Sequence, residues 1–166
     1  MIRAVVFAAA CVAAACGPGM KGGPGMNNSM NGPAATPQSS DVVSADVLAR
    51  EPITNLAHVK HILIGWKDLG DAYGGHLDPR AVARTKADAE AAVKGLLAKL
   101  KGGADFDALM KTESEDPGSA ATGRTYEVSP DAQLVIEFRL IGMRLHPGEV
   151  GVVQSDYGFH IVKRID

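Results

Sequence analysis

The segment DYGFHIVKRID, residues 156–166, decides the fold. Its apolar residues predict a strand, and because side chains alternate between the two faces of a strand, His160 faces the side opposite to Phe159. The segment VKHILI, residues 59–64, also places a histidine, His61, among apolar neighbours. If the two strands are neighbours in one sheet, the two rings can hydrogen-bond to each other while both remain neutral. The alternative is that each is an ordinary core histidine with no further role.

The chain between these two strands predicts helices that cover a small sheet. Thr85 is a helix cap, an apolar stripe at helical spacing follows it, and Gly102 and Gly103 end the helix. We therefore expect an α+β domain. Its first half contains a short helix capped by Ser44 and ending before Pro52, a strand at 57–64, a polar loop at 65–83 and a helix up to Lys101. Its second half contains a second helix from Asp105, a loop at 114–130, a third helix at about 131–143, and a hairpin at 150–165 that turns near Asp156 and Gly158.

The N-terminal residues 1–15 have the layout of an export signal. One positive charge, Arg3, precedes an apolar run that is shorter than the 20 or so residues of a membrane-spanning helix. The run ends in Ala13-Ala14-Ala15-Cys16, which resembles the lipobox of bacterial lipoproteins, where the cysteine is lipidated. The resemblance implies a lipid anchor at Cys16, and Gly17 after it implies the outer membrane, with the domain facing the periplasm. The alternative is plain secretion after an Ala-x-Ala-like cleavage site.

Residues 16–40 predict a flexible tether, because Gly, Pro, Asn and Ser dominate and cannot build a core. Its methionines at 20, 26 and 30 could instead bind copper, but their spacing is irregular and no histidine lies among them. Residues 41–56 are expected to link the tether to the domain at 57–166.

Composition excludes two classes of chemistry. The only two cysteines, Cys11 and Cys16, lie in the leader, so the folded part has neither a disulfide nor a thiol to use. The chain has 17 Lys and Arg against 19 Asp and Glu, and this near balance gives no reason to expect binding to nucleic acid.

Five short motifs occur in a fixed order at compact spacing: VKHILI, FDALMKTESEDPGSA, LVIEF, LHPGEV and YGFHIVKRID. Together they resemble the parvulin family of peptidyl-prolyl cis/trans isomerases. The resemblance covers residues 57–166. It implies a four-stranded antiparallel sheet wrapped by three to four helices, with the first and last strands at its centre. It also implies a monomer that needs no cofactor.

The resemblance assigns site residues one by one. His61 and His160 match the paired active-site histidines, Asp116 matches a position held by Cys or Asp, and Tyr157 lies at the edge of the pocket. The residues that would hold the proline ring are Leu134, Phe138 and Met143, together with Tyr126. We expect Leu134 and Phe138 to share one face of the third helix. We expect no metal site, because His58 and His61 are three apart and so face opposite sides of their strand.

Two segments depart from the family. In GRTYEVSPDAQL, residues 123–134, Tyr126 replaces a leucine, and Arg124 and Glu127 replace glycines. We expect a narrower and more polar pocket floor and a weak isomerase, whose rate Tyr126→Leu would raise or leave unchanged. The loop after the first strand has no paired arginines at its start, so we expect no preference for phosphoserine before proline.

The resulting hypothesis is an isomerase that assists the folding of exported proteins at the bacterial cell envelope. Rotation about a peptide bond has a barrier of about 18–20 kcal/mol but requires no nucleophile. An apolar pocket for the proline ring beside a polar network is therefore sufficient for catalysis. Its partners would be unfolded or extended proline-containing polypeptides. One alternative is a parvulin-like chaperone module that binds such chains without catalysis, and another is a structural lipoprotein that only bridges membrane and wall.

Overall fold

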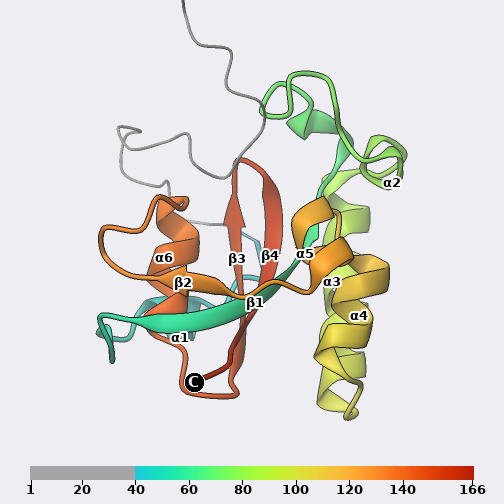
Figure 1. Ribbon diagram of the computed structural model, residues 1–166. Coiled ribbons are helices and arrows are strands. Elements are labelled where there is room, and N and C mark those ends of the chain that lie inside the picture. The colour runs from blue at the N-terminus through green and yellow to red at the C-terminus, as the bar shows by residue number, and fades with distance from the viewer. Residues whose placement is uncertain (1–39) are drawn as a thin grey trace, which may run out of the picture.

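The computed structural model describes residues 40–166 of the chain (Figure 1). The predicted export signal and Cys16, with all but the last residue of the predicted tether, lie outside the described residues. Four strands form one antiparallel sheet in the order β2-β1-β4-β3. They are β1 (Ala57–Ile64), β2 (Tyr126–Val128), β3 (Val150–Ser155) and β4 (Gly158–Arg164). The expected sheet is confirmed, and so are its central first and last strands.

The central pair β1–β4 places both histidines on one face. Its register runs from Val59 opposite Arg164 to Ile64 opposite Phe159, so His160 lies opposite Leu63, two residues beyond His61. Residues two apart on a strand point to the same side, so His61, Leu63 and His160 share one face of the sheet. The expectation that the two histidine strands are neighbours is therefore confirmed.

Four of the helices begin after a residue whose side chain caps them. Thr85 and Asp88 form a reciprocal capping box, and the Asp105 carboxylate accepts the Ala108 N–H at the start of the next helix. Gly103, with φ +92°, follows the end of the long helix. The helices are α1 (Ala45–Leu48), the 3₁₀ turn η1 (Lys67–Leu69), α2 (Pro79–Val82), α3 (Lys86–Lys101), α4 (Phe106–Glu113), α5 (Pro117–Thr122) and α6 (Ile136–Gly142).

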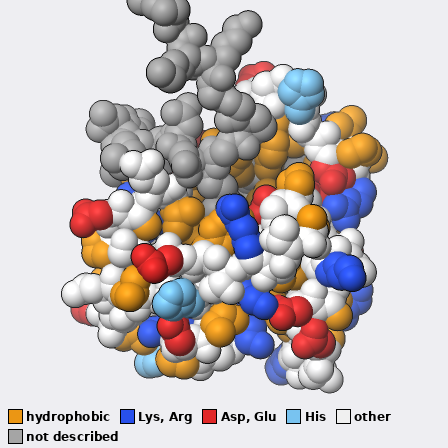
Figure 2. All heavy atoms as spheres, viewed as in Figure 1, with side chains coloured by type: hydrophobic (Ala, Val, Ile, Leu, Met, Phe, Trp, Pro, Cys, Tyr) orange, Lys and Arg blue, Asp and Glu red, His pale blue; other side chains and the backbone are white. Residues whose placement is uncertain are grey.

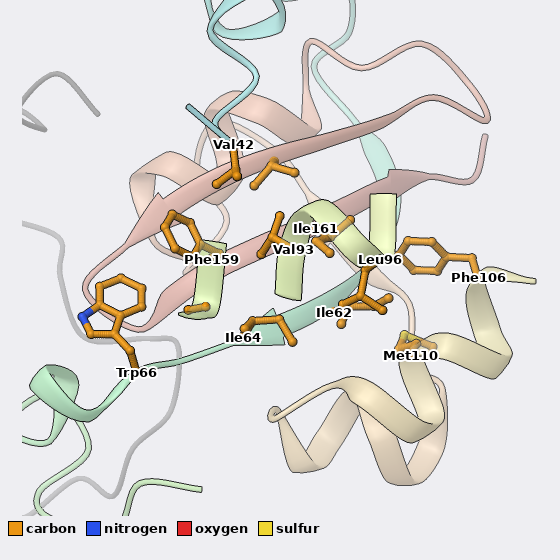
Figure 3. Close-up of a cluster of buried hydrophobic side chains, with 12 residues drawn as sticks. Val42, Ile62, Ile64, Trp66, Val93, Leu96, Phe106, Met110, Phe159 and Ile161 are labelled. Carbon is orange, nitrogen blue, oxygen red and sulfur yellow. The ribbon is translucent and has the colours of Figure 1, made fainter. Parts of the chain in front are cut away.

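Two apolar clusters hold the helices on the two faces of the sheet. On one face, α3 and α4 contribute Val93, Leu96, Phe106 and Met110 against strand residues that include Ile62 (Figure 3). On the other face, α6 and α1 pack against the side of the sheet that carries the histidines, and the buried residues there include Val47, Val59, Val128, Val135, Phe138, Ile141 and Val162. Figure 1 shows α6 and α3 on opposite sides of the sheet.

The structure corrects three expectations about local structure. The segment 114–130 is not a loop throughout, because it contains α5 and β2. The third helix begins at Ile136 and not near Asp131, because residues 130–134 form turns and bends. With α2 and α5, the described residues contain six α-helices, more than the three to four expected.

Ser44 precedes α1 as expected, but its side chain does not cap the helix. Instead its backbone N–H donates to the Val152 carbonyl, and its Oγ accepts the Val152 N–H at 2.9 Å. This contact satisfies the outer edge of β3, which would otherwise expose unpaired backbone groups. Val42 and Val47 beside it are buried, so the segment before β1 packs against the domain.

The surface agrees with the balanced composition. On the face drawn in Figure 2, acidic and basic side chains are interspersed with apolar ones. Within residues 40–166, no helix is both long and apolar enough to cross a membrane.

Candidate active site

The site is centred on the imidazole rings of His61 and His160, which are fully buried. Their Nδ1 atoms lie 3.2 Å apart, within hydrogen-bonding distance. The rings are stacked, with centroids 5.3 Å apart and planes 20° from parallel. The predicted hydrogen bond between the two rings is therefore confirmed.

The neighbours of the pair determine which ring nitrogens carry protons. The Nε2 atom of His61 lies 3.0 Å from Asp116 Oδ2, and a carboxylate only accepts, so this nitrogen carries a proton. With both rings neutral, His61 Nδ1 then accepts a hydrogen bond from the protonated Nδ1 of His160. His160 Nε2 is left as an acceptor, and the Ser155 hydroxyl donates to it at 2.7 Å. The tautomers follow from this network because each ring nitrogen has one partner.

Asp116 anchors one end of this network. It is the N-cap of α5, and its carboxylate accepts the N–H groups of Gly118 and Ser119. Side-chain donors from Ser119 and Tyr126 both lie 2.6 Å from Oδ2, in addition to His61. Burial raises the pKa of Asp116, but the hydrogen bonds from these three side chains outweigh it and hold the pKa well below its usual range. Asp116 is therefore ionised at neutral pH.

His160 is held in its neutral form. Burial lowers its pKa well below the usual 6.5, and interaction with His61 lowers it further. The Asp116 carboxylate acts in the opposite direction, but it is the weakest of the three influences. The interior of the site therefore holds one fixed negative charge, on Asp116, beside a neutral His160.

An apolar wall stands against the pair. The ring of Phe138 meets His61 edge-on at 5.1 Å and His160 at 5.6 Å. The ring of Tyr126 meets His61 at 5.1 Å and Phe138 at 5.7 Å. Leu134 is half-buried against the same cluster, but it precedes α6. The expectation that Leu134 and Phe138 share one helical face is thus wrong.

Met143 follows the opposite end of α6 from Leu134. Phe138, near the start of the helix, meets His61, whereas Gly142 packs against Val128, whose partner in the sheet is Ala57. Ala57 and His61 are four residues apart on β1, and Met143 comes after Gly142. Phe138 and Tyr126 pack against His61, and Met143 and Leu134 belong to the same apolar cluster.

A cavity of about 330 Å³ opens beside Asp116. Asp116, Leu63 and Tyr157 are among the residues that line it, whereas the two histidines and the apolar wall of Phe138, Tyr126 and Leu134 are not. The Tyr73 hydroxyl donates to the Tyr157 carbonyl at 2.6 Å, and so ties the loop after β1 to the β3–β4 turn. The remaining lining residues are His76, Leu77, Asp78, Pro79, Glu115 and Pro117. At this volume, the cavity is at the lower end of the range of binding pockets.

Sequence reasoning missed several of these residues. Ser155 and Ser119 complete the hydrogen bonds of His160 and Asp116, but serine is common in turns and neither position carried a distinct signal. Tyr73 and His76 lie in a polar loop whose path the sequence did not predict. Pro117 directly after Asp116 was a usable sign, because Asp followed by Pro is typical of a helix start.

The two arginines of the loop after β1 are both engaged. Arg80 pairs with Asp78 and donates to the Ser114 carbonyl, and Arg84 pairs with Glu115 and donates to the Gly65 carbonyl. No Lys or Arg is among the residues that line the cavity. These contacts hold the loop in place and leave no arginine fork facing the cavity.

The fold and the site together define a small α+β domain in which a buried polar network packs against an apolar wall and one of its members, Asp116, lines a cavity. A family model described as the PPIC-type PPIase domain matches residues 46–166, which is most of the chain. The chain therefore belongs to the PPIC-type, or parvulin, family of peptidyl-prolyl isomerases.

Individual relatives agree with this assignment. The chain is 31% identical over 133 residues to the foldase protein PrsA of Geobacillus kaustophilus, a match covering 80% of this chain and 47% of that protein. It is 36% identical over 88 residues to the chaperone SurA of Ralstonia nicotianae, covering 52% of this chain and 18% of that protein. The structure of the peptidyl-prolyl isomerase ESS1 from Candida albicans superposes with a TM-score of 0.53 at 25% identity, over 68% of this chain and 63% of that one. The chain spans less than half the length of the curated relatives named here.

Proposed function

We propose that the chain is an active peptidyl-prolyl cis/trans isomerase that assists folding at the bacterial cell envelope. The observation that carries the proposal is the buried pair of His61 and His160, bonded to Asp116, which itself lines a cavity. Two ionisable rings and a carboxylate are costly to bury. A site in which all three have hydrogen-bond partners is therefore better explained by a function than by core packing alone. Membership of the PPIC-type family supports the same reaction.

The chemistry we propose is rotation without covalent bonding. A planar amide is stabilised by charge separation between nitrogen and oxygen, and this separation is lost as the C–N bond twists. A water-poor surface therefore disfavours the planar form relative to the twisted one. The rings of Phe138 and Tyr126, with Leu134, supply such a surface for the proline ring.

The polar residues have a separate role in this proposal. Asp116 is ionised and fixed by five donors, so it presents a constant negative charge beside the reacting amide. His61 and His160 link that charge to Ser155 across the sheet. Because these groups are already oriented, the site needs little reorganisation when the amide twists. Tyr157 and Tyr73 close the side of the cavity. Met143, which lies in the same apolar cluster, remains a predicted member of the binding surface.

The test is exchange between cis and trans forms of a short X-Pro peptide, followed by NMR exchange spectroscopy. Spontaneous exchange takes tens to hundreds of seconds, so even a weak isomerase is visible. We expect faster exchange with the natural chain and slower exchange with Asp116→Asn. Peptide binding without any acceleration would contradict the proposal and support a chaperone module that binds extended chains without catalysis.

The location belongs to the same proposal. The lipobox-like Ala13-Ala14-Ala15-Cys16 supports a lipid anchor at Cys16, and the Gly- and Pro-rich residues 16–40 support a tether between anchor and domain. We propose that the domain works as a monomer on unfolded proline-containing chains at the outer membrane, on the periplasmic side. The names foldase and chaperone carried by its relatives are consistent with such clients.

A further inference from the structure

Tyr126 occupies the centre of the segment in which this chain departs from its family. Its ring is 6% exposed, and its hydroxyl donates to Asp116 Oδ2 at 2.6 Å. The hydroxyl also lies 3.4 Å from Ser119 Oγ, which donates to the same carboxylate oxygen. A leucine at this position could supply the wall of the slot but not the hydrogen bond.

Three neighbours hold the ring of Tyr126 in this orientation. His61 packs against it edge-on, with planes at 87°, and Phe138 does so at 69°. On another side, the Arg124 guanidinium lies 4.1 Å from the ring centroid. Arg124 replaces a family glycine, so the two departures from the family pattern contact each other. The hydroxyl is therefore aimed at Asp116 by a ring that has little freedom to turn.

The hydroxyl remains a donor over the working pH range. Burial and the hydrogen bond to Asp116 together raise the pKa of Tyr126 to about 12. A phenol at neutral pH and an ionised carboxylate form a charge-assisted hydrogen bond, which is stronger than a neutral one. Tyr126 therefore contributes directly to keeping Asp116 ionised and fixed.

We propose that Tyr126 is a positioning residue, which fixes the Asp116 carboxylate against His61 Nε2 and so sets the proton arrangement of the histidine pair. This inference rests on the proposed isomerase function and deepens it. It changes the interpretation of residues 123–134, because Tyr126 adds a hydrogen bond to the polar network of the site in addition to narrowing the apolar pocket. The expectation from the sequence that Tyr126→Leu raises the isomerase rate or leaves it unchanged is accordingly reversed, and the expected result is a loss of rate.

The decisive variant is Tyr126→Phe, which keeps the aromatic wall and removes only the hydroxyl. The readout is the pH titration of the Asp116 carboxyl carbon by NMR. We expect its midpoint to rise by roughly one pH unit, because Asp116 loses one of its charge-assisted donors.

The charged and titratable groups around Asp116 are His61 from β1, Tyr126 and Arg124 from β2 and the turn before it, Glu115 from its own segment, Tyr73 from the loop after β1, and His160 from β4.

Kinetics give the second readout. Because Tyr126 acts through Asp116 and its ring remains in the Phe variant, kcat for X-Pro exchange should fall roughly tenfold while KM is unchanged. Tyr126→Leu should lose as much in kcat and also raise KM. Ser119→Ala, which removes another donor to the same oxygen, should shift the Asp116 midpoint in the same direction as Tyr126→Phe.

The matched control is Tyr73→Phe. It removes a half-buried tyrosine hydroxyl that is bonded to the Tyr157 carbonyl and not to Asp116, so the Asp116 midpoint should stay where it is. An unmoved midpoint in Tyr126→Phe, or an unchanged kcat, would overturn the proposal. If the natural chain fails to accelerate exchange of any X-Pro peptide, the isomerase function fails instead, and the Asp116 midpoint still decides whether Tyr126 positions the carboxylate.

Discussion

The Nδ1 atoms of His61 and His160 lie 3.2 Å apart, although 99 positions separate the two residues in the chain. Removing either ring leaves a buried nitrogen of the other without its partner. We expect His61→Ala and His160→Ala each to lower the free energy of unfolding by about 1–3 kcal/mol. In urea denaturation, the double variant should lose less than the sum of the two single variants, with a coupling of at least about 0.5 kcal/mol.

His58→Ala is the control for this cycle. His58 lies on the opposite face of β1, is 42% exposed, and bonds Asp166 at the surface. Its loss should cost less than about 1 kcal/mol and should add to the His160 variant without coupling. Additive effects of His61→Ala and His160→Ala would argue against a direct interaction between the rings.

Stability should depend on pH through His160. Its folded-state pKa lies well below 6.5, so below that pH the unfolded chain binds a proton that the folded domain does not. The free energy of unfolding should therefore fall as the pH drops from about 7 to 5, by up to about 1.4 kcal/mol per pH unit. Asp116 adds a second loss at more acid pH, because its pKa is also depressed and its stabilisation disappears as it becomes protonated.

Denaturation curves of His160→Gln at the same pH values isolate this effect. Glutamine does not titrate, so the variant should be less stable at pH 7 but should lose less between about pH 7 and 5. Parallel pH dependences of the natural chain and the variant would show that His160 accepts a proton equally well in both states, contrary to its complete burial.

Phosphoserine before proline should bring no advantage. Three carboxylates, those of Asp78, Glu115 and Asp116, lie around the cavity, and no Lys or Arg lines it. A phosphate carrying nearly two negative charges would therefore meet repulsion without a bidentate partner. We expect slower NMR-measured exchange for phosphoserine-proline than for serine-proline peptides, with glutamate-proline between them as the control for charge alone. A tenfold gain on phosphorylation would refute this interpretation of the loop.

Anchoring should depend on Cys16. If this residue is lipidated, Cys16→Ser should release the chain from membranes and abolish its labelling by radioactive fatty acid. Cys11→Ser, which changes the other cysteine of the leader, should keep both properties and serves as the control. Continued membrane association of the Cys16→Ser protein would show that the lipobox-like motif is not the anchor.

The sequence predicted the elements whose signals are long and periodic. The bounds of β1 agree with the prediction, and α3 begins after Thr85 and ends at Lys101 because a capping box and a glycine pair mark its ends. By contrast, β2 has only three residues, too few to show alternation, and it exists because it pairs with β1. The short helix α5 has no apolar stripe and depends on the cap formed by Asp116.

The same distinction applies to the site. The two histidines were visible in the sequence because an ionisable ring interrupts an apolar pattern, and the antiparallel pairing of their strands then brings them together. The hydrogen bond from Tyr126 to Asp116 was not visible, because it depends on the path of the turn between α5 and β2 and on the direction of one side chain. Ser155 was missed for a similar reason, since its bond to His160 spans the β3–β4 turn.

The pairing of β1 with β4 has a consequence for how the domain is made. A ribosome produces β1 well before β4, its principal partner in the sheet, so the sheet cannot close until β4 has been synthesised. Until then the apolar side chains of β1, α3 and α4 have no complete sheet to pack against, and the nascent chain stays incompletely folded. If the chain is exported as proposed above, late closure of the sheet would keep it sufficiently unfolded for translocation.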